Sequence, residues 1–337
     1  ASGILKQSKE IRGFIKDDDG EISQIKINEE GPGESTVTVE GGSWSYTLKG
    51  TDGIKTLNFE VTDKAGTPFK TSETDALKQP RIYAGSISGS GHGTAVKFKM
   101  DTTAPISDGL SITDSSDGHE KAVERSLFLQ TGQNGTYANA KFIVKAKDAN
   151  NISEVKINIK QEGSVKDSVS AVIHAPINPS SNEVETWKTA GKNLKGLNLK
   201  DGTVEFEIEL TDKSGLKSVT SYTAFIDNTA PDLKVLSPSS AGNISGDVTM
   251  TGSITDGGSG VTGLKYIKGR QASEPTLSSA WTDVEASSGT WKIDFSGANS
   301  ITSSHNINQL GDVLPESGGK LYKVPVYFLT LDKVNNS

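Results

Sequence analysis

Residues 101–105 read Asp-Thr-Thr-Ala-Pro, and residues 227–231 repeat this stretch as Asp-Asn-Thr-Ala-Pro. The two copies lie 126 residues apart (227 − 101 = 126). Each copy follows a short run in which apolar and polar residues alternate, residues 95–100 and residues 222–226. Alternation with a period of two predicts a half-buried strand, and proline ends such a strand because it has no N–H to donate. The repeat therefore indicates a strand that leads into a domain junction, twice.

Two further motifs recur in a fixed order, and each of them occurs three times. The first motif is a strand, an acidic turn and a second strand, with its turns at 17–20, 148–151 and 256–260. The second is an alternating strand that ends in Asp-Lys and a turn of small residues, at 59–66, 208–215 and 328–335. A tryptophan lies between the two motifs in each copy: Trp44, Trp187 and Trp291. Many short strands joined by Gly, Asn and Asp turns predict tandem β-sandwiches.

These motifs together resemble bacterial immunoglobulin-like (BIg) repeat domains, and the resemblance covers nearly the whole chain. It implies an all-β fold of three tandem immunoglobulin-like β-sandwich domains in an extended array, over residues 1–102, 103–229 and 230–337. The second domain departs from the pattern by a long insertion around residues 173–200. Repeats of this kind form rod-like stalks of surface adhesins and other large exported proteins.

The outer two domains are expected to be incomplete. The first copy of the motifs begins without the strand that should follow a D-x-T-A-P junction, and the third copy stops before its last strand. An unpaired strand edge promotes aggregation. We therefore expect either a fragment of a longer array or outer domains that are completed by other strands.

Composition narrows the class of protein. In this chain of 337 residues, 33% are hydrophobic and 6% aromatic, which favours several small cores over one large core. The net charge of -7 argues against nucleic acid as a partner. The sequence contains no run of 18 apolar residues, so it predicts no membrane span. The chain has no cysteine, which excludes disulfides, Cys-ligated zinc and thiol catalysis, and a Cys-free sandwich favours bacterial export.

Catalytic motifs are missing from the sequence. No G-x-S-x-G elbow is present, and the four histidines lie in loop-like stretches: His92, His119, His174 and His305. We therefore expect no enzyme but a monomeric extracellular segment of a bacterial cell-surface protein, a stalk or adhesin that contacts a host or matrix protein or a glycan. The alternative is a carbohydrate-binding accessory region of an exported polysaccharide-degrading enzyme. Trp44 and Trp291 are expected in the cores, and Trp281 is the candidate for an exposed contact.

The direction of the strands predicts where the aspartates gather. In an immunoglobulin-type sandwich, the acidic turn, the T-D-K-x-G turn and the incoming linker all lie at the N-terminal pole. Asp101 should therefore meet Asp148 and Asp212, and Asp227 should meet Asp256 and Asp332. Three converging carboxylates repel one another unless a cation compensates them, and Ca²⁺ takes such oxygen ligands. The alternative is that these residues only cap turns. Asp17 and Asp18 align equally well with Asp148.

Overall fold

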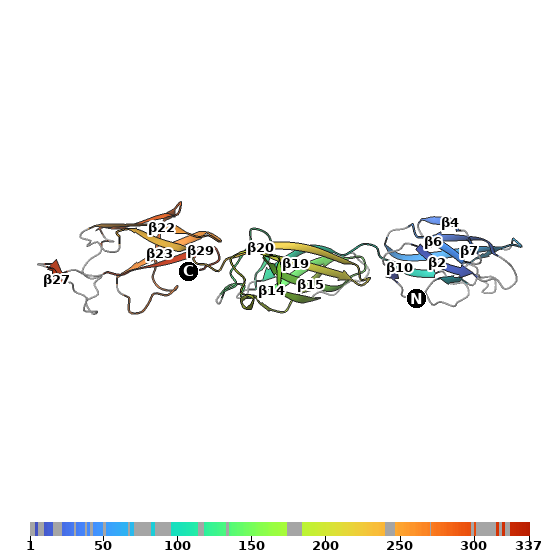
Figure 1. The fold of residues 1–337 in the computed structure, drawn as a ribbon, viewed down its shortest axis with the longest axis horizontal. Coiled ribbons are helices and arrows are strands. Elements are labelled where there is room, and N and C mark those ends of the chain that lie inside the picture. The colour runs from blue at the N-terminus through green and yellow to red at the C-terminus, as the bar shows by residue number, and fades with distance from the viewer. Residues whose placement is uncertain are drawn as a thin grey trace.

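The computed structural model is almost entirely β-strand, in three sandwiches that follow one another along the chain. Figure 1 shows them in a row along the long axis of the molecule. The structure describes residues 4–5, 10–15, 22–29, 32–37, 39–40, 43–49, 52–66, 68–70, 82–84, 96–113, 118–132, 135–173, 184–239, 247–269, 271–297, 300, 315–316, 319–320 and 324–337. The predicted fold class, three immunoglobulin-like β-sandwiches in an extended array, is confirmed.

The first sandwich packs two sheets around one apolar core that draws on residues between Ile11 and Met100. One sheet has the order β1-β10-β7-β3-β4, with β8 also paired to β7, and the other has the order β5-β6-β2-β9. The strands are β1 (Ile4–Leu5), β2 (Glu10–Ile15), β3 (Ile22–Glu29), β4 (Gly33–Val37), β5 (Val39–Glu40), β6 (Ser43–Thr47), β7 (Gly53–Asp63), β8 (Pro68–Lys70), β9 (Ile82–Ala84) and β10 (Val96–Met100).

Among the described residues, the second sandwich has the largest core, formed by residues between Leu110 and Ile226. Its strands follow the order β12-β11-β14-β17-β16-β15-β19-β20-β13, with β18 paired to β14, so that β16 joins the two layers. The strands are β11 (Ile106–Thr113), β12 (Glu120–Ala122), β13 (Phe128–Leu129), β14 (Asn139–Lys147), β15 (Ile152–Gln161), β16 (Ser164–Ile173), β17 (Glu185–Lys188), β18 (Lys192–Asn193), β19 (Gly202–Asp212) and β20 (Lys217–Ile226). A short 3-10 helix, η2 (Lys195–Leu197), lies in the predicted insertion.

The third sandwich has, among the described residues, the smallest core, which is formed by residues between Val248 and Phe295. One sheet has the order β21-β22-β26-β25 and the other β24-β23-β29, and β27 and β28 form a separate hairpin. The strands are β21 (Asp232–Ser237), β22 (Val248–Thr255), β23 (Val261–Lys268), β24 (Thr282–Val284), β25 (Ala286–Ser287), β26 (Thr290–Phe295), β27 (Pro315–Glu316), β28 (Gly319–Lys320) and β29 (Val326–Asp332). Among the described residues, β29 pairs with β23 alone.

One strand of the first sandwich comes from an unexpected part of the chain. In the other two sandwiches, the strand before the acidic turn pairs along its outer edge with the strand that follows the linker, β14 with β11 and β22 with β21. In the first sandwich this edge of β2 is paired with β9 instead. Because β9 lies between β8 and β10, a late segment of the domain occupies the position of its first strand.

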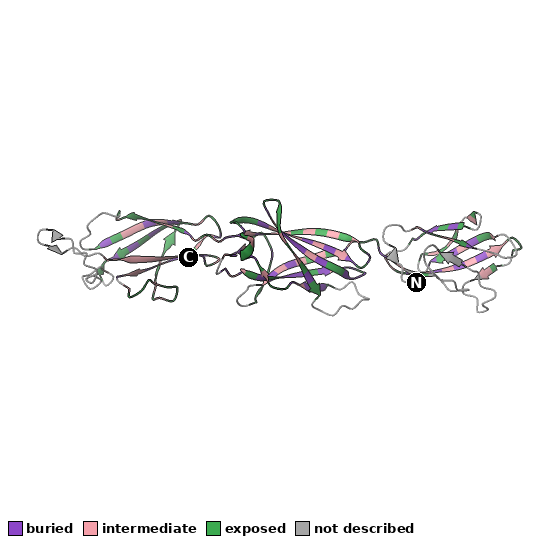
Figure 2. Cartoon of the chain, turned by 60° about the horizontal axis from the view of Figure 1, so that its bottom comes forward, coloured by how far each residue is buried: buried purple, intermediate pink, exposed green. Residues whose placement is uncertain are grey.

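Each core contains one of the repeated tryptophans. Trp44 and Trp291 are buried, 3% exposed each, as predicted. Trp187 is buried as well, and it lies on β17, which pairs with β14 just as β6 pairs with β2 and β26 with β22. Figure 2 shows buried and exposed residues alternating along the strands. This is the pattern of a sandwich in which each sheet has one face in the core and one face exposed to solvent. Within the described residues, no helix is long and apolar enough to cross a membrane.

Candidate metal centres at the domain junctions

Three aspartates from separate segments meet where the first sandwich joins the second. Asp101 follows β10 in the linker, Asp148 begins the turn between β14 and β15, and Asp212 ends β19. One carboxylate oxygen from each lies within 4.8 Å of the others, and all three residues are buried. The strand directions explain the meeting, because β14 and β19 both end at the pole that the linker enters. The structure thus brings together the first predicted trio.

Several oxygens of this first cluster have no protein donor. Both carboxylate oxygens of Asp101 and Oδ2 of Asp212 are buried without a hydrogen-bond partner among the described residues. The side-chain amide of Asn150, also buried, is unpartnered in the same way. Oδ1 of Asp212 accepts bonds from Ser214 Oγ (2.7 Å) and Leu216 N (2.9 Å). A buried polar group without a partner costs about 1–3 kcal/mol, and a charged one more, so this cluster calls for a compensating charge.

The surroundings of Asp148 in the first cluster raise its pKa. Burial, followed by the nearby carboxylates of Asp101, Asp212 and Glu185, raises its pKa from 3.8 to about 6, although the backbone N–H of Asn150 donates to it and acts in the opposite direction. That bond, from Asn150 N to Oδ1 of Asp148, is 2.6 Å long. A cation between the carboxylates would favour their charged forms and reverse the shift.

The second junction repeats the arrangement with Asp227, Asp256 and Asp332. Their carboxylate oxygens again lie within 4.8 Å of one another, with Asp256 less buried than the other two. The linker residue Asp227 comes within this distance because Gly258 has no side chain, since a Cβ there would lie 2.4 Å from the Asp227 carboxylate carbon. The structure therefore brings together the second predicted trio as well.

Hydrogen bonds distinguish the second cluster from the first. Asp227 accepts bonds from the backbone N–H groups of Ser259 (2.6 Å) and Thr229 (3.4 Å). Asp332 accepts from the N–H groups of Val334 (2.8 Å) and Asn336 (2.9 Å), and Asp256 accepts from two glycine N–H groups of its own turn. Each of the six carboxylate oxygens here accepts at least one hydrogen bond, so these aspartates also act as turn formers.

Both clusters have dimensions that suit one Ca²⁺ ion. Ca²⁺ binds oxygens at about 2.3–2.6 Å, so two ligands on opposite sides of one ion lie about 4.6–5.2 Å apart. Separations of at most 4.8 Å therefore let all three carboxylates reach a common ion. At the first junction the free amide oxygen of Asn150 lies two residues from Asp148. Carboxylate and amide oxygens are the ligands that Ca²⁺ prefers, and its coordination tolerates irregular geometry.

Each linker is also tied to the sandwich that precedes it. Asp52 accepts hydrogen bonds from the hydroxyls of Thr102 (2.8 Å) and Thr103 (2.6 Å). At the second junction, Asp201 accepts one from the hydroxyl of Thr229 and one from the backbone N–H of Asn228 (2.7 Å). Both aspartates precede a glycine with positive φ, Gly53 and Gly202, so the same Asp-Gly device occurs twice. Each linker is thus attached by hydrogen bonds to the sandwich that precedes it.

The sequence motifs did not identify two further polar residues at the junctions. Glu185 on β17 is buried beside the first cluster, where it accepts bonds from the N–H of Ile152 (3.1 Å) and from the indole of Trp187 (3.0 Å). Asn336 follows β29, and its side-chain amide donates to Asp332 Oδ2 (2.7 Å). Neither residue belongs to a repeated motif, and the equivalent of Asn336 in the second sandwich is Leu216, whose N–H makes the same turn bond.

The other candidate residues form no site among the described residues. The acidic turn with Asp17 and Asp18 lies outside the described residues, as do His92, His174 and His305. His119 is exposed. Trp281, expected as an exposed contact, is only half exposed, and its indole N–H donates to the carbonyl of Thr276 (2.7 Å).

The sequence matches no protein-family model and no curated protein. Among solved structures, the chain is similar to the fibronectin(III)-like modules of Clostridium thermocellum CbhA, with 12% identity over 67% of this chain and 90% of that one and a TM-score of 0.26. It is similar to a tetra-tandem repeat in the extending region of a large adhesion protein (16% identity, 99% and 71% coverage, TM-score 0.27). A 1.5-MDa bacterial ice-binding adhesin gives 14% identity, 88% and 83% coverage and a TM-score of 0.30. The architecture above rests on the strand pairing and the cores themselves.

Proposed function

We propose that this chain is a non-catalytic, monomeric spacer segment of a bacterial cell-surface protein, built from BIg-type repeats over residues 1–102, 103–229 and 230–337. Its role is to hold an extended shape, as a stalk that carries a binding region for a host or matrix protein or a glycan. Ca²⁺ bound at each junction stiffens the segment. An extracellular location supplies enough of this ion for sites of modest affinity.

The first aspartate cluster is the observation that carries this proposal. Asp101 belongs to the linker, whereas Asp148 and Asp212 belong to two turns of the following sandwich. An ion bound by all three therefore ties the linker to the next domain at a fixed angle. Without the ion, the three buried carboxylates, of which Asp101 and Asp212 have unpartnered oxygens, repel one another and push the linker away from the turns.

The two junctions are expected to differ in affinity. The carboxylates of the second cluster already accept backbone hydrogen bonds, so an ion adds less there than at the first cluster. We expect the first site to bind Ca²⁺ more tightly and to dominate the stiffening.

Small-angle X-ray scattering in calcium and in a chelator tests the proposal. In calcium we expect the maximum dimension of a straight three-domain array, and in the chelator a shorter mean dimension with a broader distribution. Magnesium serves as the control ion, since its stricter octahedral geometry fits these turns less well. A scattering curve that does not change between calcium and chelator contradicts the stiffening role.

A further inference from the structure

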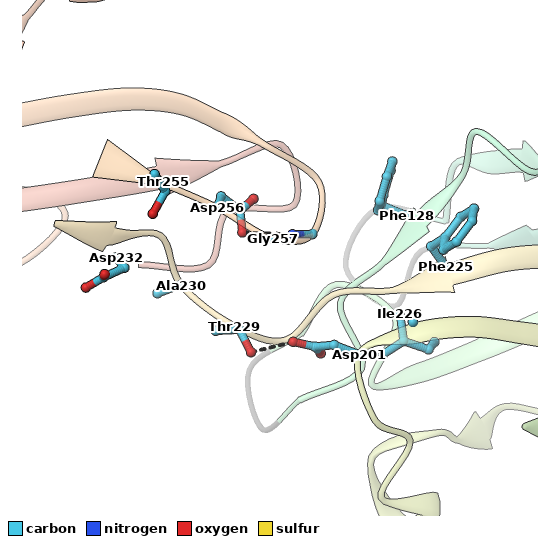
Figure 3. A pocket seen from close by; sticks show the side chains of 12 residues that line it. Phe128, Asp201, Phe225, Ile226, Thr229, Ala230, Asp232, Thr255, Asp256 and Gly257 are labelled. Carbon is cyan, nitrogen blue, oxygen red and sulfur yellow. Dashed lines mark hydrogen bonds between the residues drawn. The ribbon is translucent and has the colours of Figure 1, made fainter. Parts of the chain in front are cut away.

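A cavity of about 570 Å³ lies between the second and third sandwiches, beside the second linker (Figure 3). On one side it is lined by Phe128 and Phe225, and on the other by the turn from Thr255 to Gly258. This volume falls in the range of pockets that hold small molecules.

The aromatic wall comes from two neighbouring strands of the second sandwich. Phe128 on β13 is the register partner of Phe225 on β20, and their rings stack with centroids 5.6 Å apart at an interplanar angle of 27°. Both residues on either side of Phe225, Ala224 and Ile226, are buried in the core. Because successive residues of a strand face opposite sides, Phe225 faces away from that core and remains half exposed.

The charged residues described on the cavity wall are all aspartates. Asp201, Asp232 and Asp256 line it, and the described residues of its lining include no lysine, arginine or histidine. Asp232 has an exposed partner in Lys234 at 3.4 Å, a pair that contributes little in water. Carboxylates beside aromatic rings form a setting that attracts a cation, because the ring faces carry negative charge.

At the first junction, a lysine occupies the position that corresponds to Phe225. Lys99 on β10 pairs with Ile54, and Phe225 on β20 pairs with Thr203, and both partners follow the Asp-Gly device described above. Lys99 and Phe225 are therefore equivalent positions of the two sandwiches. The Lys99 ammonium lies 3.5 Å from the carbonyl oxygen of Ala149, in the acidic turn of the next domain. At the first junction, a lysine of the chain itself thus reaches across to that turn.

We propose that the cavity at the second junction binds the ammonium group of a lysine side chain from a partner protein. The incoming ammonium lies against Phe225 and Phe128, close to the turn at Gly257, as Lys99 does at the first junction. Asp201, which lies on the same side as the aromatic pair, supplies the countercharge. Asp201 lies outside the second aspartate cluster, whereas the turn at Gly257 follows Asp256 of that cluster.

The test uses nuclear magnetic resonance with Nα-acetyl-lysine methylamide as the probe. We expect chemical-shift changes of the Gly257 and Gly258 amides and of the two phenylalanine rings, with a dissociation constant on the order of millimolar. The matched probe acetylated at Nε lacks the charge and should leave these signals unchanged. Titrations are run in calcium and in a chelator. Binding in calcium tests this proposal, and a difference between the two conditions reports on the cation sites instead.

Three variants sharpen the test. Phe225→Lys places the chain's own ammonium in the cavity, as at the first junction, and should abolish binding of the probe. Phe225→Leu keeps an apolar side chain and should weaken binding about tenfold through loss of the ring face. Val219→Ala is the matched control, because Val219 is an exposed residue of the same strand, and it should bind like the wild type.

Two outcomes overturn the proposal. If neither probe shifts the cavity signals, or both shift them equally, the cavity has no ammonium selectivity. If cellohexaose or another neutral oligosaccharide shifts them while the lysine probe does not, the aromatic pair is a glycan platform instead.

Discussion

The side-chain amide of Asn336 donates a hydrogen bond of 3.1 Å to the backbone carbonyl of Asp227, so the turn after β29 holds the linker that enters the third sandwich. The same amide donates to the Thr229 carbonyl at 3.4 Å, and the side-chain oxygen Oδ1 of Asn336 accepts a bond from the side-chain amide of Gln130 in the second sandwich. This residue connects both domains and the linker at the second junction. The first junction has Leu216 at the equivalent position, which can make no such side-chain bonds.

Asn336→Ala should therefore loosen the second junction without removing a carboxylate. We expect a loss of about 1 kcal/mol in the free energy of unfolding of the third domain, the usual value of a hydrogen bond. Spin labels on the second and third sandwiches should report a broader distance distribution. Ser337→Ala, an exposed neighbour, is the control and should change neither quantity. An unchanged distance distribution in Asn336→Ala shows that the linker is held by other contacts.

The raised pKa of Asp148 predicts an unusual pH dependence. Its value of about 6 in the folded chain lies above the ordinary 3.8, so the folded state binds more protons than the unfolded state between pH ~4 and ~6. Without calcium, the free energy of unfolding of the second domain should decrease as pH rises through this window. Calcium must displace the proton, so calcium affinity should increase as pH rises towards and above 6.

Urea denaturation between pH 4 and 8, in chelator and in calcium, measures both effects. Asp148→Asn removes the titrating group and should flatten the slope of the calcium-free protein in this window. A wild type and an Asp148→Asn variant with parallel pH profiles contradict the assignment.

Substitutions at and around the buried Trp291 are expected to lower the stability of the third domain. Trp291→Ala should cost about 3–5 kcal/mol, the range for a large buried aromatic side chain. Gly252→Ala should also destabilise the third domain, because a Cβ there would lie 2.0 Å from the Lys234 carbonyl oxygen and 2.3 Å from the Trp291 ring. Gly263→Ala is the matched strand control, since its Cβ would make an ordinary 3.6 Å contact with Leu331. Thermal melts that rank Gly263→Ala below Gly252→Ala in stability disagree with this packing.

The sequence motifs predict the fold and the two aspartate trios because both follow from repetition and strand direction. The linker and two turns recur in a fixed order, and the topology of the sandwich brings them to one pole. The Asp-Gly device of Asp52 and Asp201 is also repeated, so aligning the copies before β7 and β19 could have revealed it.

Other features could not be predicted because they have no counterpart in the repeat. The β9 segment, which pairs along β2, lies in a stretch found only in the first domain. Glu185 reaches the first cluster from the insertion of the second domain, and Asn336 replaces an apolar residue at its repeat position. The exchange of Lys99 for Phe225, by contrast, follows from the D-x-T-A-P repeat, because the two residues lie 126 residues apart (225 − 99 = 126), and the strand register agrees with it.

Calcium titration by calorimetry, on the wild type and on Asp212→Asn, tests the cation sites most directly. Asp283→Asn serves as the control, since Asp283 is exposed and its only described ion pair is with Lys265 at 3.1 Å. We predict two bound ions for the wild type and for Asp283→Asn, and one for Asp212→Asn, which loses the tighter site. A wild type that takes up no calcium, or an Asp212→Asn variant that binds it as the wild type does, contradicts the assignment of these aspartates as metal ligands.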